Sequence, residues 1–423
     1  MLNAVRGGEG SSIPVKTHMV RLSCYAVLRS AVFLSAFLLF TAPGGSQTLS
    51  PGETTESSIP DFRVIRFAGP FEEPWSIAFL PEGGMLVTER PGRLQHVPPG
   101  GKSSSPVAGL PPVLTGEHAG LMDVILDPDF ARNRTIYLSY VHGEDDASTV
   151  RVLKATLDPA GIALSDQQVI FEAQPYALEL INYGGRLAFD AAGFLYLTLG
   201  DRFEEKRGQD LSDDWGSVIR MRRDGSFPED NPFAGKAGAR PGIWTYGHRN
   251  PQGLAVDAQS GQIWLHEHGP QGGDELNLIQ RGHNYGWPVI TYGVGYDGKP
   301  ISALTHAEGM EQPLYYWVPS IAISGLALYQ ADRAPQWHGT VWLGALGGEA
   351  LVRLSLEGGK VVREERLLKE KFGRIRDVRV GPDGLIYIVN DDPEGALYRI
   401  EPHPRSVARA TCGERIAAGK CQR

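Results

Sequence analysis

One local pattern occurs six times along this chain and constrains the fold more than any other feature. Each copy has a small or glycine-containing start, an alternating apolar strand, a turn and a second strand that usually carries an aromatic residue. Such strands joined by glycine-containing turns predict β-hairpins. A hairpin cannot bury both of its faces alone, so six copies, spaced by roughly 45 to 70 residues, predict sheets that close into a ring. The copies occupy residues 75–89, 120–140, 185–201, 253–267, 325–344 and 376–391.

The predicted fold is therefore all-β, a six-bladed β-propeller of four-stranded antiparallel blades placed at residues 60–402. Outer strands are predicted at 148–158, 349–358 and 395–402, and residues 62–65 would complete the final blade. The 42% of hydrophobic residues, together with 52 glycines and 30 prolines, is typical of a folded and turn-rich chain. The sequence gives no sign of a second domain.

The amino-terminal segment, residues 1–48, is predicted to be a signal peptide. Lys16, Arg21 and Arg29 precede a short apolar run at 31–40, and small residues follow it. This order is typical of a secretory signal, and the apolar run is short for a transmembrane helix. An uncleaved anchor is the alternative. We therefore expect a periplasmic or secreted protein with no stable membrane span after signal removal.

The three cysteines are consistent with export. Cys24 would leave with the signal peptide, whereas Cys412 and Cys421 would remain in a tail at 403–423. In an oxidising compartment this pair could form a disulfide. Two idle thiols are the alternative.

Polar residues that suit an anionic ligand and a cation gather around the fourth copy. Arg249 and Asn250 precede its first strand and offer a fixed donor fork and an amide, which suit carboxylates. Gly269 and Pro270 follow its second strand in a glycine-punctuated, oxygen-rich stretch. Because Ca²⁺ takes backbone carbonyls and carboxylates, a calcium site here is chemically reasonable. An ordinary polar loop is the alternative.

A pair of arginines opens the sixth copy. Arg374 and Arg376 alternate along a predicted strand, so both would point to one face of it. Two guanidiniums on an inner strand are hard to explain as core and suggest an anionic ligand near the ring axis. The alternative is salt bridges to Asp377 or to a neighbouring loop.

Three further polar residues lie at predicted strand ends: His118, Asn182 and Asp201. A histidine in such a position could serve as a general base. A solvated loop histidine is the alternative.

Four strings in combination, GHRNPQGLA, EHGPQGGDELN, NYGWP and RIRDV, resemble a known family over residues 62–402. It comprises the soluble aldose sugar dehydrogenases that depend on pyrroloquinoline quinone (PQQ), also called the glucose/sorbosone dehydrogenase family. The resemblance implies that hydride passes from the anomeric carbon of the sugar to the quinone, and that the carbonyls of Gly269 and Pro270 bind Ca²⁺. It assigns four side chains to the quinone: Arg249, Asn250, Arg374 and Arg376.

The proton-transfer residues depart from the family pattern. The family usually has a catalytic His where this chain has Asn182, and a Gln where it has His118. The resemblance also implies that Asp201 orients the base. Because a neutral amide is not a competent base, we hypothesise that the base has moved to His118.

These features predict a PQQ- and calcium-dependent oxidoreductase (EC 1.1.5.-) that oxidises aldose sugars or related alcohols to lactones, with activity reduced by the change at Asn182. A separate quinone or cytochrome would accept the electrons, since the chain has no CxxCH haem motif. The net charge of −8, without a dense Lys/Arg stripe, argues against a nucleic-acid partner. One alternative is a propeller that binds a sugar, polymer or protein without efficient catalysis, and another is a metal-dependent lactonase.

Overall fold

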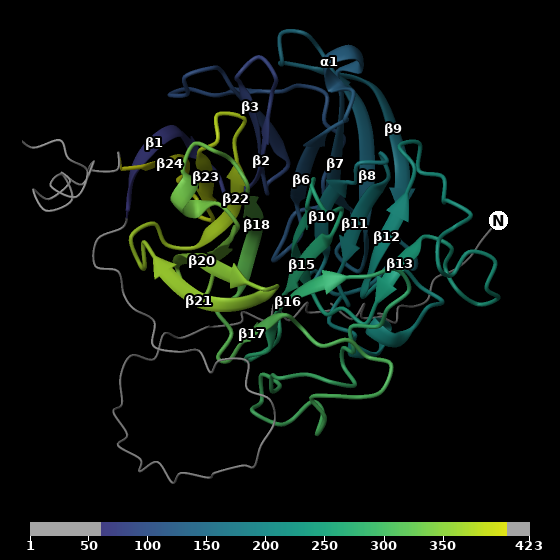
Figure 1. Ribbon diagram of the computed structural model, residues 1–423. Coiled ribbons are helices and arrows are strands. Elements are labelled where there is room, and N and C mark those ends of the chain that lie inside the picture. The colour runs from purple at the N-terminus through teal and green to yellow at the C-terminus, as the bar shows by residue number, and fades with distance from the viewer. Residues whose placement is uncertain (1–60, 404–423) are drawn as a thin grey trace, which may run out of the picture. The chain divides into compact units, whose positions relative to one another are not determined.

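The computed structural model describes residues 61–403 and confirms the predicted all-β fold (Figure 1). Six four-stranded antiparallel sheets form the blades of a propeller. The predicted signal peptide, residues 1–48, and the predicted Cys412–Cys421 disulfide lie outside the described residues. Among the residues described, no helix has the length and apolar character needed to cross a membrane.

The outer strands predicted from sequence are confirmed as β8, β20 and β24. Three short helical turns accompany the strands, α1 (Phe130–Asn133), η1 (Glu205–Gln209) and η2 (Pro335–Trp337). The strands are β1 (Phe62–Phe71), β2 (Pro74–Phe79), β3 (Met85–Glu89), β4 (Arg93–Val97), β5 (Ser105–Pro106), β6 (Leu121–Leu126), β7 (Thr135–Glu144), β8 (Ala147–Leu157), β9 (Leu164–Glu172), β10 (Gly184–Phe189), β11 (Leu195–Leu199), β12 (Ser217–Met221), β13 (Ile243–Tyr246), β14 (Pro251–Val256), β15 (Ile263–Glu267), β16 (Asp274–Ile279), β17 (Tyr315–Trp317), β18 (Ile323–Tyr329), β19 (Thr340–Ala345), β20 (Ala350–Glu357), β21 (Lys360–Leu367), β22 (Ile375–Val380), β23 (Ile386–Asn390) and β24 (Gly395–Pro402).

Five blades are built from consecutive strands, and the sixth joins the two ends of the described chain. Its strand order is β1–β24–β23–β22, and β1 pairs antiparallel with β24 from Phe62↔Pro402 to Phe71↔Gly395. This pairing confirms the prediction that residues 62–65 complete the final blade. The hydrogen bonds between β1 and β24 close the ring and thereby fix the positions of the blades around its axis.

The core lies between the blades, where the middle of each second strand is sealed from solvent. Burying such a side chain stabilises the fold by about 1.5–3 kcal/mol each. The frame is therefore rigid enough to hold loops and strand ends in place. One fully buried residue from each second strand illustrates this packing: Leu86, Leu138, Leu197, Leu265, Leu343 and Ile388.

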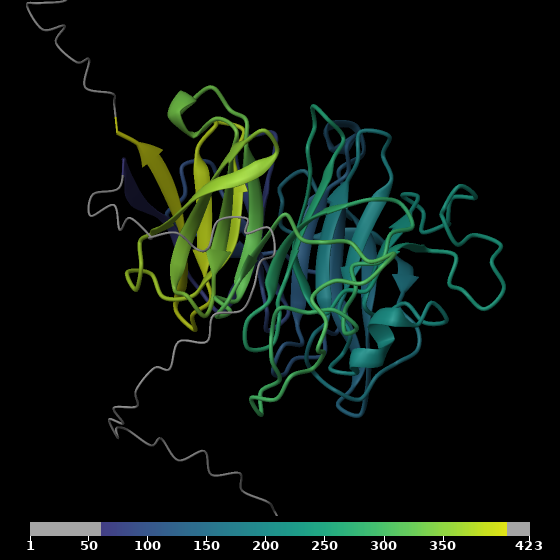
Figure 2. The ribbon, with the colours of Figure 1, turned by 60° about the horizontal axis from the view of Figure 1, so that its bottom comes forward.

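Every inner strand has a shift in pairing register close to its first residues. The shifts occur in β2, β6, β10, β14, β18 and β22 against the second strand of the same blade. Such β-bulges leave a residue outside the ladder and re-aim its side chain. All six bulges lie near the starts of the inner strands. The longest connection, between β16 and β17, extends away from the blades (Figures 1 and 2).

Candidate active site

A cavity of about 440 Å³ lies where the inner strands begin. Its volume suits a small organic ligand. Four residues singled out from the sequence line it: His118, Asn250, Arg374 and Arg376. Each of the six inner strands, or the residue just before it, contributes to the wall: Trp75, Met122, Gly184, Gln252, Ala322 and Arg376.

The two arginines of the sixth copy meet at a single carboxylate. Arg374 Nε lies 3.2 Å and Arg376 Nη2 2.8 Å from Oδ2 of Asp391, which follows β23. Burial raises the pKa of Asp391, but the two guanidiniums outweigh it and the net shift is downward. The two arginines face one cavity, as predicted, but regular strand alternation is not the reason, since Arg374 precedes β22 and the bulge between Ile375 and Asp377 contains Arg376.

Arg376 retains hydrogen-bonding capacity that the protein does not use. Its Nη1 lies 3.4 Å from the side-chain oxygen of Gln252, and its Nε has no hydrogen-bond partner among the described residues. Buried polar atoms are normally paired, so an orphaned guanidinium nitrogen beside a cavity calls for an acceptor from a ligand. Of the alternatives given from sequence, Arg374 and Arg376 do not form the salt bridge to Asp377, but they do pair with a neighbouring loop, since their common partner Asp391 directly follows β23.

The Arg249–Asn250 turn is held from below by Glu267, the last residue of β15. One Glu267 oxygen accepts from the backbone N–H of Arg249 at 2.6 Å, and the other lies 2.8 Å from Nδ1 of His248. The Arg249 guanidinium also lies 5.4 Å from the ring of Trp287. Both predicted cofactor residues of this turn are buried, which fixes their direction before any ligand arrives.

The predicted calcium carbonyl of Gly269 already has a partner in the protein. Arg249 Nη1 donates to it at 3.0 Å and to the carbonyl of His268 at 3.2 Å. Only glycine fits at position 269, because a Cβ there would lie 2.1 Å from the carbonyl oxygen of Gly272. A cation bound at this carbonyl must share it with Arg249 or displace the guanidinium, and the assignment of Gly269 and Pro270 to calcium remains a prediction.

Asn182 and Asp201 form a buried pair directly beside the Arg249 turn, because the Asp201 N–H donates to the Arg249 carbonyl at 2.7 Å. Asn182 Nδ2 donates to Asp201 Oδ1 at 2.9 Å, and that carboxylate also accepts from the Phe203 N–H at 2.9 Å and from Trp287 Nε1 at 2.8 Å. Burial raises the pKa of Asp201, against the opposing effects of Arg249 and these hydrogen bonds. Asp201 therefore orients the side chain at position 182, but that side chain is an amide.

His118 is exposed at the cavity wall and touches the same pair. Its Nδ1 lies 3.3 Å from the backbone N of Asn182, which donates to it. Partial desolvation of the ring, followed by the positive charges of Arg376 and Arg90, lowers the pKa of His118 to about 4. The imidazole is therefore neutral at pH 7, and with Nδ1 accepting, its proton lies on Nε2.

Sequence reasoning missed the carboxylates that hold this site together. Asp391 and Glu267 were not singled out, although each ends or follows the second strand of a blade, as Asp201 and Glu89 do. The recurring endings VTE, LGD, LHE and VND of the hairpin copies carried that signal. An acidic residue at the same structural position in four blades places a ring of anchors around one end of the propeller.

Comparison with known proteins assigns the chain to a family. The model for "Glucose / Sorbosone dehydrogenase" matches residues 71–399. The aldose sugar dehydrogenase YliI of Escherichia coli (strain K12) is 42% identical over 335 residues, covering 78% of this chain and 90% of that protein. The apo structure of the soluble aldose sugar dehydrogenase of E. coli has a TM-score of 0.78 at 41% identity, over 81% of this chain and 100% of that one. A PQQ-bound aldose sugar dehydrogenase from Streptomyces coelicolor has a TM-score of 0.68 at 28% identity, over 80% and 98% of the two chains.

The matched region spans all six blades, and the fold agrees with that of the solved relatives. This chain belongs to the glucose/sorbosone dehydrogenase family of sugar-oxidising enzymes.

Proposed function

We propose that this protein oxidises aldose sugars, or related alcohols, to lactones with PQQ held in the cavity above the inner strands. The observation that carries the proposal is the convergence of Arg374 and Arg376 on one wall of a cavity whose other walls carry Asn250 and His118. A structure of a relative with PQQ bound supports the choice of cofactor. When bound, PQQ supplies the electron sink that takes up hydride from the substrate.

The residues present fit an anionic, planar cofactor. Arg376 has a buried Nε without a protein partner, and guanidiniums match carboxylates in charge and geometry. Arg374 and Arg376 would bind carboxylates of the cofactor, while Asp391 keeps both guanidiniums directed at the cavity. Asn250 and Arg249 would hold the cofactor from the fourth blade.

Calcium belongs to the same proposal. The carbonyl oxygens of Gly269 and Pro270 would bind it, since hard cations favour backbone oxygens. Arg249 Nη1 donates to the Gly269 carbonyl, so a cation that binds there would have to displace it. Calcium binding would then free the Arg249 guanidinium for the cofactor, so that each of the two ligands would favour binding of the other.

His118 is the proposed base for the hydroxyl proton of the substrate. It is neutral at pH 7, it lines the cavity, and Asn182 cannot perform the task. Nε2 can take up a proton only if the ring proton moves to Nδ1; alternatively, the ring turns over and the unprotonated Nδ1 itself accepts the substrate proton. Either change breaks the 3.3 Å contact with the Asn182 N–H, which is long for a hydrogen bond and therefore weak.

The second candidate is a propeller that binds its ligand without efficient turnover. It is favoured by one observation, that the base position of the family holds a buried amide paired with Asp201. Loss of a general base typically slows a reaction by about 10²–10⁴-fold. This candidate predicts normal PQQ binding with sugar oxidation at a small fraction of the rate of the relatives.

The experiment that tests the proposal is a PQQ titration of the Ca²⁺-loaded protein, followed by absorbance and by aldose-dependent dye reduction. Saturable binding with PQQ- and Ca²⁺-dependent dye reduction is expected. Binding without dye reduction would favour the second candidate, and no binding would overturn both. The dye replaces the separate quinone or cytochrome that we propose as acceptor for this periplasmic or secreted protein.

A further inference from the structure

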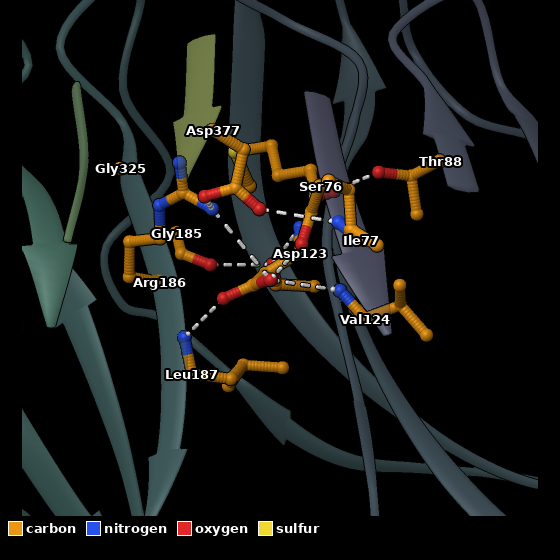
Figure 3. Close-up of polar contacts among 12 residues, drawn as sticks. Ser76, Ile77, Thr88, Asp123, Val124, Gly185, Arg186, Leu187, Gly325 and Asp377 are labelled. Atoms are coloured by element: carbon orange, nitrogen blue, oxygen red, sulfur yellow. Dashed lines mark hydrogen bonds and ion pairs between the residues drawn. The ribbon is translucent and has the colours of Figure 1, made fainter. Parts of the chain in front are cut away.

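Beneath the cavity the inner strands enclose four charged side chains, which we call the axial cluster: Asp123, Arg186, Asp377 and Arg379. Figure 3 shows the Arg186 guanidinium between Asp123 and Asp377. The Arg186 side chain is 1% exposed and the two carboxylates are fully buried. These residues lie one to three positions further along their strands than the residues that line the cavity.

The axial cluster is balanced in charge. Arg379 donates at 2.9 Å to each of the two carboxylates, and Arg186 Nη1 lies 3.0 Å from Asp377 Oδ1. Two cations and two anions at these distances leave little net field in the cavity. If the cluster affects the ligand, it must do so through the groups that its members hold in place.

Arg186 differs from Arg379 in what its remaining donors reach. Its Nε donates to the carbonyl of Gln252 at 2.7 Å and its Nη2 to the carbonyl of Arg376 at 3.2 Å. Its guanidinium also stacks 4.0 Å from the ring centroid of Trp75. All three of these residues line the cavity, and they come from three other blades.

The positions of the two carbonyls explain why they need donors from outside the strand ladder. Gln252 and Arg376 both lie at the register shifts of their strands, where the ladder is locally disrupted. A buried carbonyl needs a donor, and Arg186 supplies one to each, with Ser324 Oγ adding a second at 2.6 Å to Arg376. Fixing a carbonyl fixes the backbone dihedrals of its residue and thus the direction in which its side chain leaves.

We propose that Arg186 is a positioning residue for the cofactor. From beneath the cavity, Arg186 fixes the backbone of the bulges at Gln252 and Arg376 and the orientation of the Trp75 ring. The inference rests on the proposed function, because PQQ is the ligand whose binding residues Arg186 would position. Arg186 acts on the cofactor through the Arg376 side chain and the cavity floor, without touching it.

The test compares Arg186→Lys with the matched control Arg379→Lys in the Ca²⁺-loaded full chain. Each variant keeps the charge and replaces a planar fork by a single ammonium group. Arg186→Lys is expected to weaken PQQ binding by about tenfold or more, because a fork that spans two carbonyls is lost. Arg379→Lys should lower the melting temperature while keeping the PQQ dissociation constant within about twofold, since its donors go only to the cluster and to Ser76.

PQQ binding is measured by absorbance titration, and kcat is measured at saturating PQQ. The inference predicts a weaker Kd with a KM for the sugar close to that of the wild type. Equal PQQ affinity in wild type and Arg186→Lys, or equal losses in both variants, would overturn it while leaving the proposed function intact. Failure of the wild type to bind PQQ would instead overturn the proposed function itself.

A second variant covers the case in which Arg186→Lys does not fold. The double substitution Arg186→Met with Asp377→Asn removes one cation and one anion, so that no unpaired charge is left buried. It lacks the two Arg186 donors, so the Gln252 carbonyl loses its side-chain donor and the Arg376 carbonyl keeps only Ser324 Oγ. The same loss of PQQ affinity is expected, and retention of wild-type affinity would contradict the positioning role.

Discussion

The two sides of the cavity differ in how fully their polar groups are paired. On the cofactor side, Arg374 and Arg376 line the cavity and Arg249 is buried outside its lining; these guanidiniums are anchored by Asp391 or by carbonyls, yet Arg376 keeps an unused donor. On the proton-transfer side, His118 lines the cavity and Asn182 and Asp201 are buried outside its lining; the Asp201 carboxylate accepts three hydrogen bonds from the protein.

Under the proposed function, this difference would mean that the two halves of one reaction can diverge separately. Guanidiniums with unused donors bind an anionic ligand favourably, so the residues of the cofactor side would keep a function. A saturated Asn–Asp pair can hold a loop without any ligand, and it moves no proton. Only His118 on that side is both exposed to the cavity and titratable.

The largest expected effect is that of His118→Ala on turnover. If His118 is the base, kcat for dye-linked aldose oxidation should fall by about 10²–10⁴-fold, since proton abstraction loses its acceptor. The PQQ dissociation constant should change little, because the cofactor side is untouched. Turnover is measured at saturating PQQ and Ca²⁺; unchanged kcat would end the idea that the base has moved.

A rescue variant sharpens this result. Asn182→His places an imidazole beside Asp201, in a left-handed backbone conformation (φ 52°) that His tolerates better than most residues. Combined with His118→Ala, it should recover much of the lost kcat, because the Asp201 carboxylate would orient the new base. A double variant as slow as His118→Ala would show that position 182 no longer faces the substrate.

Sequence reasoning predicted the fold better than the site, for physical reasons. Strand alternation and glycine turns are local, so six hairpins and the pairing of 62–65 with the last blade could be inferred from period and composition. The β-bulges could not, because a register shift depends on the partner strand. For that reason Arg376 was expected on a regular strand, and the hydrogen bond from Arg186 to its carbonyl was missed.

The next largest effect is expected from Arg376→Met. Hydrogen bonds to charged groups are worth about 1.5–3 kcal/mol, so PQQ binding should weaken roughly 10- to 150-fold. The effect should appear in the dissociation constant, measured by absorbance titration, while kcat at saturating PQQ stays close to that of the wild type. A fall in kcat with unchanged PQQ affinity would mean that Arg376 affects the chemical step and not the binding of the cofactor.

PQQ binding should also shift the titration of His118, which links the two sides. Without ligand, desolvation and nearby arginines lower the pKa of His118 to about 4, whereas an unfolded chain takes up this proton near its ordinary value of 6.5. Stability of the ligand-free protein should therefore decrease as the pH falls from 6.5 through 4. An anionic cofactor that neutralises the guanidiniums should raise this pKa by about one unit or more, observable in the NMR shifts of the imidazole. An unchanged pKa of His118 would mean that the charge of the bound cofactor does not affect the proton-transfer side.

The smallest expected effect is that of Arg374→Met, and its size is informative because Arg374 and Arg376 share one carboxylate. The Arg374 side chain is 48% exposed, whereas that of Arg376 is 11% exposed. Exposed ion pairs contribute about 0.2–1 kcal/mol and are screened by salt, so PQQ affinity should fall by no more than about fivefold. The loss should shrink when the titration is repeated at high ionic strength, unlike that of Arg376→Met. Equal, salt-insensitive losses of PQQ affinity in the two variants would mean that the bound cofactor buries Arg374 as deeply as Arg376. The cofactor side of the cavity would then close around its ligand.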